Sequence, residues 1–184
     1  MKIKQIESIL KSSKTIIVYE GSECQWLSNG EAIYPIYNLP PLTEGHIFSM
    51  YDIPEDKRDK FYFETRLLPE NINFEDIDKD EKLLTRSQIG LMINGNHLEP
   101  LEVESGLVYI NKKYLKPFSD LSDGYELYVR SSLSGSEYIA VKSGLVLIGI
   151  IAPCCVIDEH LIENLKKIYE LSEATLFNSK GDKL

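Results

Sequence analysis

The spacing of apolar side chains in residues 2–13 predicts an amphipathic helix at the start of the chain. Four apolar residues recur at intervals of about three and therefore share one face: Ile3, Ile6, Ile9 and Leu10. Lys4 and Lys11 lie seven residues apart on the opposite face, and Lys14 lies near that face together with Glu7. We therefore expect a helix with a basic outer side.

The pattern then changes to that of β-strands joined by a tight turn. Residues 15–20 (TIIVYE) are rich in β-branched side chains, which favour a strand. Residues 24–28 and 31–37 flank Asn29-Gly30, a dipeptide that favours a type I′ hairpin because both central residues take positive φ angles. The sequence thus predicts three consecutive strands.

Pro40-Pro41 interrupts this pattern, and the chain becomes more polar after it. Residues 46–53 predict a short strand, residues 54–60 a charged turn, and residues 61–68 an edge strand because aromatic and polar side chains alternate there. Residues 69–84 form an acidic connector, whose first fourteen residues hold six acidic side chains against two lysines. We expect this connector to be exposed, either as a solvated linker or as an interaction loop.

A second hairpin is predicted after the connector. Asn94-Gly95 separates residues 90–93 from residues 96–101, and both flanking segments are compatible with strands. The turn dipeptide again favours a two-residue connection, which joins antiparallel strands.

Residues 106–156 predict a strand, a short basic helix and three further strands. The helix, over residues 111–121, has apolar residues on one side and lysines on the other: Tyr114, Leu115, Phe118 and Leu121 against Lys112, Lys113 and Lys116. Pro117 lies inside it and limits it to a turn or two. The strands are predicted at residues 106–110, 125–132, 137–142 and 145–156.

Residues 158–175 predict a C-terminal helix with Asp158 as its N-cap and a broad apolar face. Together these elements predict a single α+β domain. It would contain largely antiparallel, twisted sheets, two short helices packed on one side, and the added C-terminal helix. Its parts would be a first half (1–68), the acidic connector (69–84), a second half (85–156) and the C-terminal helix (158–175).

The formal net charge of −9 argues against general binding of nucleic acid, because non-specific affinity comes mostly from neutralising phosphates. A local basic strip is still compatible with this charge, since salt screens surface fields within about 8–10 Å. A helix with three lysines on its outward side is an exception in an acidic chain. It indicates a surface suited to phosphate.

Catalytic and metal-binding patterns give little support for an enzyme. A thiol nucleophile would need a cysteine with His46, His97 or His160, but the sequence around the three cysteines has no recognisable protease context. Adjacent Cys154 and Cys155 fit a zinc site poorly, and no phosphate-loop or dinucleotide-binding motif is present. We expect no catalytic residue, metal or cofactor, and a soluble cytoplasmic protein without signal peptide or membrane span.

The second half resembles one domain of the bacterial DNA sliding clamps, the processivity factors of DNA polymerases. Residues 109–115 (YINKKYL) are similar to the entry of the clamp inner helix, where an apolar residue and Asn precede two variable positions and a Tyr-Leu pair. Residues 147–153 (LIGIIAP) look like the closing strand of a clamp domain. The resemblance covers about residues 106–156 and implies two strand-helix-three-strand units whose helices face DNA.

We therefore expect a non-enzymatic, clamp-like or clamp-derived protein of DNA metabolism, encoded by a phage or other mobile element. Duplex DNA would be bound by a basic strip of six lysines: Lys4, Lys11, Lys14, Lys112, Lys113 and Lys116. Proteins of replication or recombination would be its partners, and the chain would be a monomer or dimer. The alternative is a protein–protein adaptor without DNA binding, which would use the acidic connector and the aromatic strand residues.

Overall fold

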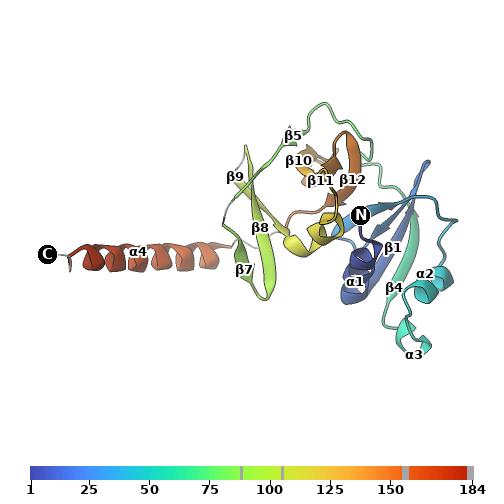
Figure 1. Cartoon of the computed structure of the whole chain (residues 1–184), viewed down its shortest axis with the longest axis horizontal. Helices are drawn as coiled ribbons and strands as arrows, with labels where there is room; N and C mark the ends of the chain where they lie inside the picture. Colours follow the sequence, from blue (N-terminus) through green and yellow to red (C-terminus); the bar gives the residue numbers. More distant parts are fainter. Residues whose placement is uncertain (88, 105, 155–157, 182–184) are drawn as a thin grey trace. The chain divides into compact units, whose positions relative to one another are not determined.

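The computed structural model describes residues 1–87, 89–104, 106–154 and 158–181, with side chains as far as residue 175. The chain divides into two units, Met1–Cys154 and Cys155–Leu184. The first unit is built on an eight-stranded mixed sheet and a smaller four-stranded antiparallel sheet (Figure 1). The α+β class is therefore confirmed.

The elements of the first half are α1 (Ile3–Ser13), β1 (Thr15–Glu20), β2 (Gln25–Ser28), β3 (Ala32–Ile36), α2 (Glu44–Met50), α3 (Glu55–Arg58) and β4 (Tyr62–Leu67). The second half begins with β5 (Lys82–Leu83), β6 (Thr85–Arg86), β7 (Leu91–Ile93), β8 (Asn96–Val103) and β9 (Gly106–Asn111). It continues with the 3-10 helix η1 (Lys112–Phe118) and the strands β10 (Glu126–Ser131), β11 (Glu137–Ser143) and β12 (Val146–Ile151). Helix α4 (Glu159–Gly181) belongs to the second unit.

The large sheet has the strand order β4-β1-β2-β3-β12-β11-β10-β5. Each half contributes a helix followed by three antiparallel strands, α1-β1-β2-β3 and η1-β10-β11-β12. The third strands of the two series pair with each other, with Ile33 opposite Ile150 and Ala32 opposite Ile151. The two halves of the large sheet therefore share a repeated order of elements.

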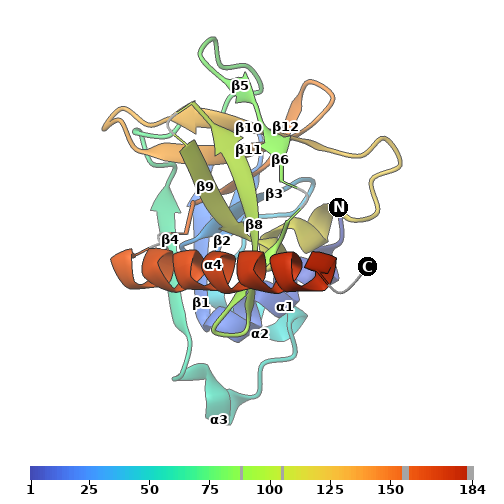
Figure 2. The same ribbon diagram turned by 90° about the vertical axis from the view of Figure 1, so that its left-hand side faces the viewer.

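The smaller sheet has β8 at its centre, paired with β6, β7 and β9 (Figure 2). Its hairpin turn confirms the prediction for Asn94-Gly95, since φ is 50° at Asn94 and 77° at Gly95. The same prediction is wrong for Asn29, because only Gly30 has positive φ there. The Asn29 side chain instead accepts hydrogen bonds from the main chain of Glu31 and Ala32, which stabilises a longer loop.

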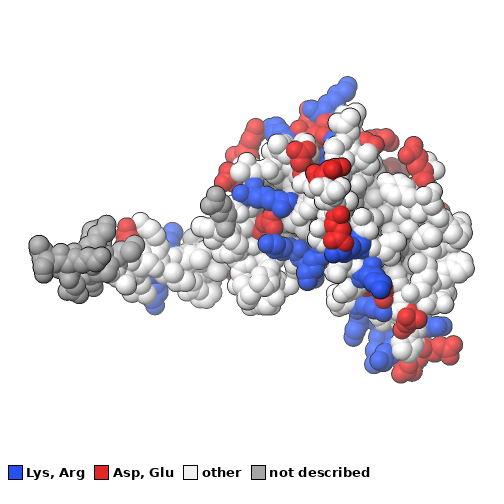
Figure 3. All heavy atoms as spheres, viewed as in Figure 1, with Lys and Arg blue, Asp and Glu red and all other residues white. Residues whose placement is uncertain are grey.

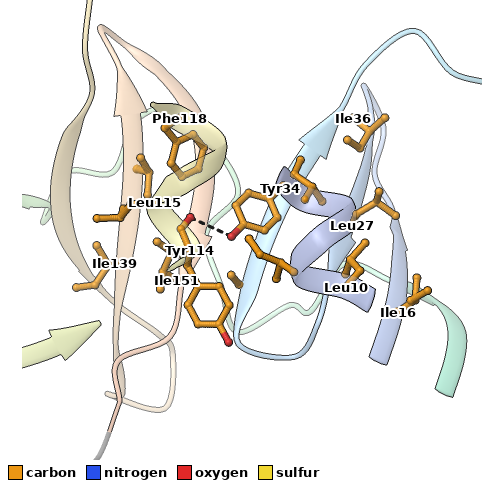
Figure 4. Packing of buried hydrophobic residues seen from close by; sticks show 14 of the residues in the cluster. Leu10, Ile16, Leu27, Tyr34, Ile36, Tyr114, Leu115, Phe118, Ile139 and Ile151 are labelled. Atoms are coloured by element: carbon orange, nitrogen blue, oxygen red, sulfur yellow. Dashed lines mark hydrogen bonds between the residues drawn. The ribbon is translucent and has the colours of Figure 1, made fainter. Parts of the chain in front are cut away.

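Helices α1, α2 and η1 pack on one face of the large sheet. Figure 4 shows part of this core, in which residues of both halves meet: Leu10, Ile16, Leu27, Tyr34 and Ile36 from the first half, and Tyr114, Leu115, Phe118, Ile139 and Ile151 from the second. Strand side chains alternate between the two faces, so each strand delivers every second residue to this core. Residues of α1, α2 and η1 belong to this one core cluster.

The connector is largely exposed, as expected, but part of it docks on the opposite face of the sheet. Phe74 packs its ring edge-on against Trp26 at 5.1 Å between centroids, and Ile72 joins the same apolar cluster. Buried Arg130 donates hydrogen bonds to the main-chain carbonyls of Asn73, Glu75 and Asp76. The acidic side chains Glu75 and Asp76 remain exposed, but the segment itself is docked on the sheet.

Arg130 also forms an ion pair with Glu81, and Lys142 binds the other carboxylate oxygen of Glu81 at 2.5 Å. Arg130 and Lys142 are almost completely buried. Two buried cations therefore share one carboxylate of the connector, which fixes its end to β10 and β11.

The strand predicted at residues 46–53 is wrong, because α2 occupies most of this segment. Thr43 and His46 form a capping box, in which Thr43 Oγ1 accepts from the His46 N–H and His46 Nδ1 accepts from the Thr43 N–H. Ile47 and Tyr51 then lie four residues apart on the buried side. Residues 54–60, predicted as a turn, contain the short helix α3.

The predictions for the sheet edges are partly correct. Strand β4 is an edge strand as expected, but it pairs with β1 in parallel. The apolar segment 145–156 is also a candidate for an unpaired edge that a second copy could join, but this prediction is wrong, because β12 is paired with β3 on one side and β11 on the other. Strand β12 ends at Ile151, and residues 155–157 lie outside the described residues.

In the second unit, Asp158 is the N-cap of α4, since its Oδ1 accepts from the Leu161 N–H at 2.8 Å. The helix continues to Gly181, beyond the predicted end at residue 175. Its apolar side chains Leu165, Ile168 and Tyr169 are exposed. None of the helices in the described part of the chain is long and apolar enough to span a membrane.

Candidate nucleic-acid interface

The start of α1 and the end of η1 are joined directly. The Lys2 N–H donates to the Pro117 carbonyl at 2.7 Å, and the Lys2 ammonium lies 2.5 Å from the Asp120 carboxylate. The two lysine-bearing helices therefore lie next to each other on the same side of the large sheet. Figure 3 shows Lys and Arg side chains gathered over both helices, with acidic side chains between them.

On α1, the three predicted lysines differ in their surroundings. Lys4 and Lys14 are exposed, and Lys14 takes the left-handed C-cap conformation with φ of 55°. Lys11 is partly exposed, and its ammonium lies 2.6 Å from the Glu7 carboxylate. Because the positive charge of Lys11 is largely balanced by Glu7, Lys4 and Lys14 are the stronger candidates for phosphate contacts on this helix.

On η1, the lysines are placed by the cap of the helix. The Asn111 side chain accepts from the Lys113 N–H at 3.1 Å and donates to Asn96 Oδ1 at 3.0 Å. Lys112 and Lys116 are exposed. Lys113 is partly buried, with its Nζ 4.8 Å from the centre of the Tyr114 ring. No ion pair involves these three lysines among the described residues, so their charges are available to a ligand.

Helix η1 is held firmly despite its short length. The Tyr34 hydroxyl donates to the Tyr114 carbonyl at 3.0 Å (Figure 4), and the Tyr114 hydroxyl donates to Glu31 at 2.7 Å. Burial, followed by the hydrogen bond with Glu31, raises the pKa of Tyr114 well above its usual range, so its hydroxyl stays a donor. These contacts fix the helix on which Lys112, Lys113 and Lys116 are carried.

The sequence did not predict the cavity beside these lysines. It has a volume of about 570 Å³ and lies between the β7–β8 turn and η1. Its lining residues are Gly95, Asn96, His97, Asn111, Lys112, Lys113, Leu115, Lys116, Ser119 and Tyr125. Three of the six predicted lysines line it, together with residues of the β7–β8 hairpin, for which the sequence predicts only a structural role. The Asn94-Gly95 turn is the one sequence signal that bears on this cavity, because it determines where the tip of the β7–β8 hairpin lies along the chain.

Comparisons with known proteins provide no family for this chain. No protein-family model, no curated protein and no solved structure matches it. The function is therefore inferred from the geometry of the chain itself.

The alternative chemistry based on cysteine and histidine gains no support from the described residues. Burial and then the Glu23 carboxylate raise the pKa of the Cys24 thiol, which disfavours a thiolate. Cys154 is partly buried, and Cys155 lies outside the described residues. His46 belongs to the α2 capping box. In the part of the chain that the structure describes, no group of three or more His, Cys, Asp or Glu side chains is placed to hold a metal ion.

Proposed function

We propose that this protein is a non-enzymatic, clamp-like protein of DNA metabolism that binds duplex DNA through the side formed by α1 and η1. The observation that carries the proposal is the direct junction of the two helices at Lys2 and Pro117. This junction brings both lysine sets to one side of the sheet, where a duplex could contact them together. Five of the six lysines have no ion pair among the described residues, and Lys11 is the exception.

The repeated order of elements also supports the proposal. Each half has a helix followed by three antiparallel strands, and the two helices share one face of the large sheet. Clamp domains resemble this arrangement, since they combine two such units with DNA-facing helices. The net charge of −9 fits the same function, because acidic side chains elsewhere would limit binding to the basic side.

A single domain of this size cannot encircle a duplex. The proposed binding is therefore either non-encircling or made by a self-associated form, and we propose a monomer or dimer. Among the described residues, β4 lies at the outer edge of the large sheet, which is the position at which a second copy could add.

Titration of a fluorescent duplex at several salt concentrations tests the proposal. Each lysine that contacts a phosphate should contribute about one unit to the slope of log affinity against log salt. The triple variant Lys4→Gln, Lys112→Gln, Lys116→Gln should lose about three units. Lys79→Gln, an exposed lysine in the connector, is the matched control and should leave the slope unchanged. Absence of binding by the wild-type protein at low salt, or equal slopes for all variants, would contradict the proposal.

A second function, a protein–protein adaptor, is favoured by a different observation. A cavity of about 390 Å³ lies where the docked connector meets the aromatic strand residues. Trp26, Tyr37 and Phe74 line it together with Glu75 and Asp76. This is the combination of acidic connector and aromatic side chains that the adaptor hypothesis requires. The duplex titration separates the two functions, since an adaptor would show no binding and a defined dimer in light scattering.

A further inference from the structure

The cavity between the β7–β8 turn and η1 has the charge and shape of a ligand site. Its volume of about 570 Å³ lies within the range of small-molecule sites, about 300–1,000 Å³. The described lining residues include three lysines and one histidine but no acidic side chain. In a chain with a net charge of −9, this concentration of positive charge selects an anion.

The remaining lining residues indicate that the ligand is larger than a phosphate ion. The partly buried ring of Tyr125 provides apolar surface, and Asn96 and Asn111 provide amide groups. A phosphate group alone would contact only the lysines and leave this apolar surface without a partner. A nucleotide carries both an anionic phosphate and a planar base, which can pack on apolar and aromatic side chains.

The walls of the cavity are fixed before any ligand arrives. The Asn96–Asn111 hydrogen bond ties the hairpin tip to the helix cap at 3.0 Å. Tyr125 is held by the Arg86 guanidinium, 4.6 Å from its ring centre, and by the ring of Phe118 at 5.6 Å between centroids. A preformed site loses less conformational entropy on binding, which favours affinity for a small ligand.

We propose that this cavity binds a nucleoside 5′-phosphate, either as the terminal nucleotide of a DNA strand or as a free nucleotide. The lysines of η1 would hold the phosphate, and Tyr125 would contact the base. The inference deepens the proposed DNA binding and rests on it in part, because Lys112, Lys113 and Lys116 belong to both surfaces. His97 and Ser119 line the cavity but are not part of the predicted lysine strip.

The test uses three probes with the full-length protein: dAMP in calorimetry, a linear duplex with 5′-phosphate or 5′-hydroxyl ends, and a dumbbell duplex without ends. The wild-type protein should bind dAMP, and it should bind the 5′-phosphorylated duplex at least several-fold more tightly than the 5′-hydroxyl duplex. Binding of dAMP without an end preference assigns the cavity to free nucleotides, whereas an end preference assigns it to strand ends. The inference would be overturned if dAMP did not bind at millimolar concentration and the 5′-phosphate made no difference to duplex affinity.

Variants distinguish this inference from the proposed function. His97→Glu places a carboxylate opposite the lysines, and should weaken dAMP binding at least tenfold and remove the end preference. Dumbbell binding should weaken much less, because Lys4 and Lys14 lie outside the cavity and are unchanged. Lys4→Gln should reduce the salt slope of dumbbell binding and leave dAMP binding unchanged, because Lys4 lies outside the cavity. Ser119→Glu, at an exposed position, repeats the cavity test if His97→Glu does not fold. If both cavity variants bind dAMP as tightly as the wild-type protein, the inference is overturned. If the wild-type protein binds dAMP but not the dumbbell duplex, only the proposed function is contradicted.

Discussion

Gly149 of β12 lies directly beneath the ring of Phe118 from η1. A Cβ atom at position 149 would lie 2.6 Å from Phe118 Cζ and 3.3 Å from the carbonyl oxygen of Ile33. Glycine at this position therefore allows η1 to pack closely on the sheet, and the position of the basic helix depends on it.

Gly149→Ala should destabilise the protein by about 1–3 kcal/mol, because the added methyl group overpacks a core in which Phe118 is only 1% exposed. The measurement is urea unfolding followed by circular dichroism. Phe118→Leu is the partner for a double-mutant cycle, since a smaller side chain makes room for the methyl group. Additive effects of the two substitutions would contradict the proposed clash.

Glu81→Gln should destabilise the protein by about 3 kcal/mol or more, since it leaves buried Arg130 and Lys142 without their shared carboxylate. The connector should also open, which limited proteolysis within residues 69–80 would detect. Glu75→Gln is the matched control, because the Glu75 side chain is exposed and its main-chain carbonyl, which binds Arg130, is unchanged. Equal proteolysis of the two variants would show that the ion pairs do not hold the connector.

Tyr51→Phe should change the free energy of unfolding by less than about 0.5 kcal/mol or increase it. The Tyr51 hydroxyl is buried and has no hydrogen-bond partner among the described residues, so its removal loses nothing. Tyr114→Phe is the contrasting variant and should cost about 1 kcal/mol, because it removes the bonds to Asn29 and Glu31. Thermal unfolding of both variants checks the difference, and a larger loss for Tyr51→Phe would contradict it.

Cys24 should react slowly with iodoacetamide near neutral pH. Burial and Glu23 raise the pKa of its thiol, so less thiolate is present than in an unperturbed cysteine, and the rate should increase as the pH rises. Glu23→Gln should accelerate the reaction because it removes one of the causes of the raised pKa. Peptide mapping by mass spectrometry measures Cys24 separately from the other cysteines. Modification of Cys24 faster than that of a free thiol would indicate an activated nucleophile.

The sequence predicted most elements whose pattern depends on nearby residues. The spacing of Ile6, Ile9 and Leu10 predicted α1, and Pro117 predicted a shortened second helix. Helix α2 was missed because its few apolar residues fit the spacing of a helix as well as that of a strand. The decisive signal for the helix is the Thr43 cap. Local patterns therefore predicted an element correctly where one spacing of apolar residues extended over its whole length.

Long-range contacts were beyond such patterns. The connector looked like a solvated acidic segment because its partner, Arg130, is 49 residues from Glu81 in the sequence. At the candidate site, the lysines could be identified from their helical spacing, since that spacing is local. The cavity could not be predicted, because His97 reaches η1 only through the fold and the Asn96–Asn111 bond.

The pairing of β3 with β12 has a consequence for how the chain folds. Within each half, the helix and its three strands are close in sequence, so their contacts close short loops and can form quickly. The β3–β12 ladder instead joins Ile33 to Ile150, more than a hundred residues away, and only two residue pairs define its register. Closing this ladder carries the largest entropic cost of any pairing in the large sheet. We therefore expect the meeting of two partly formed halves to limit the rate of folding. Substitutions along the β3–β12 ladder should then affect that rate more than substitutions within either half.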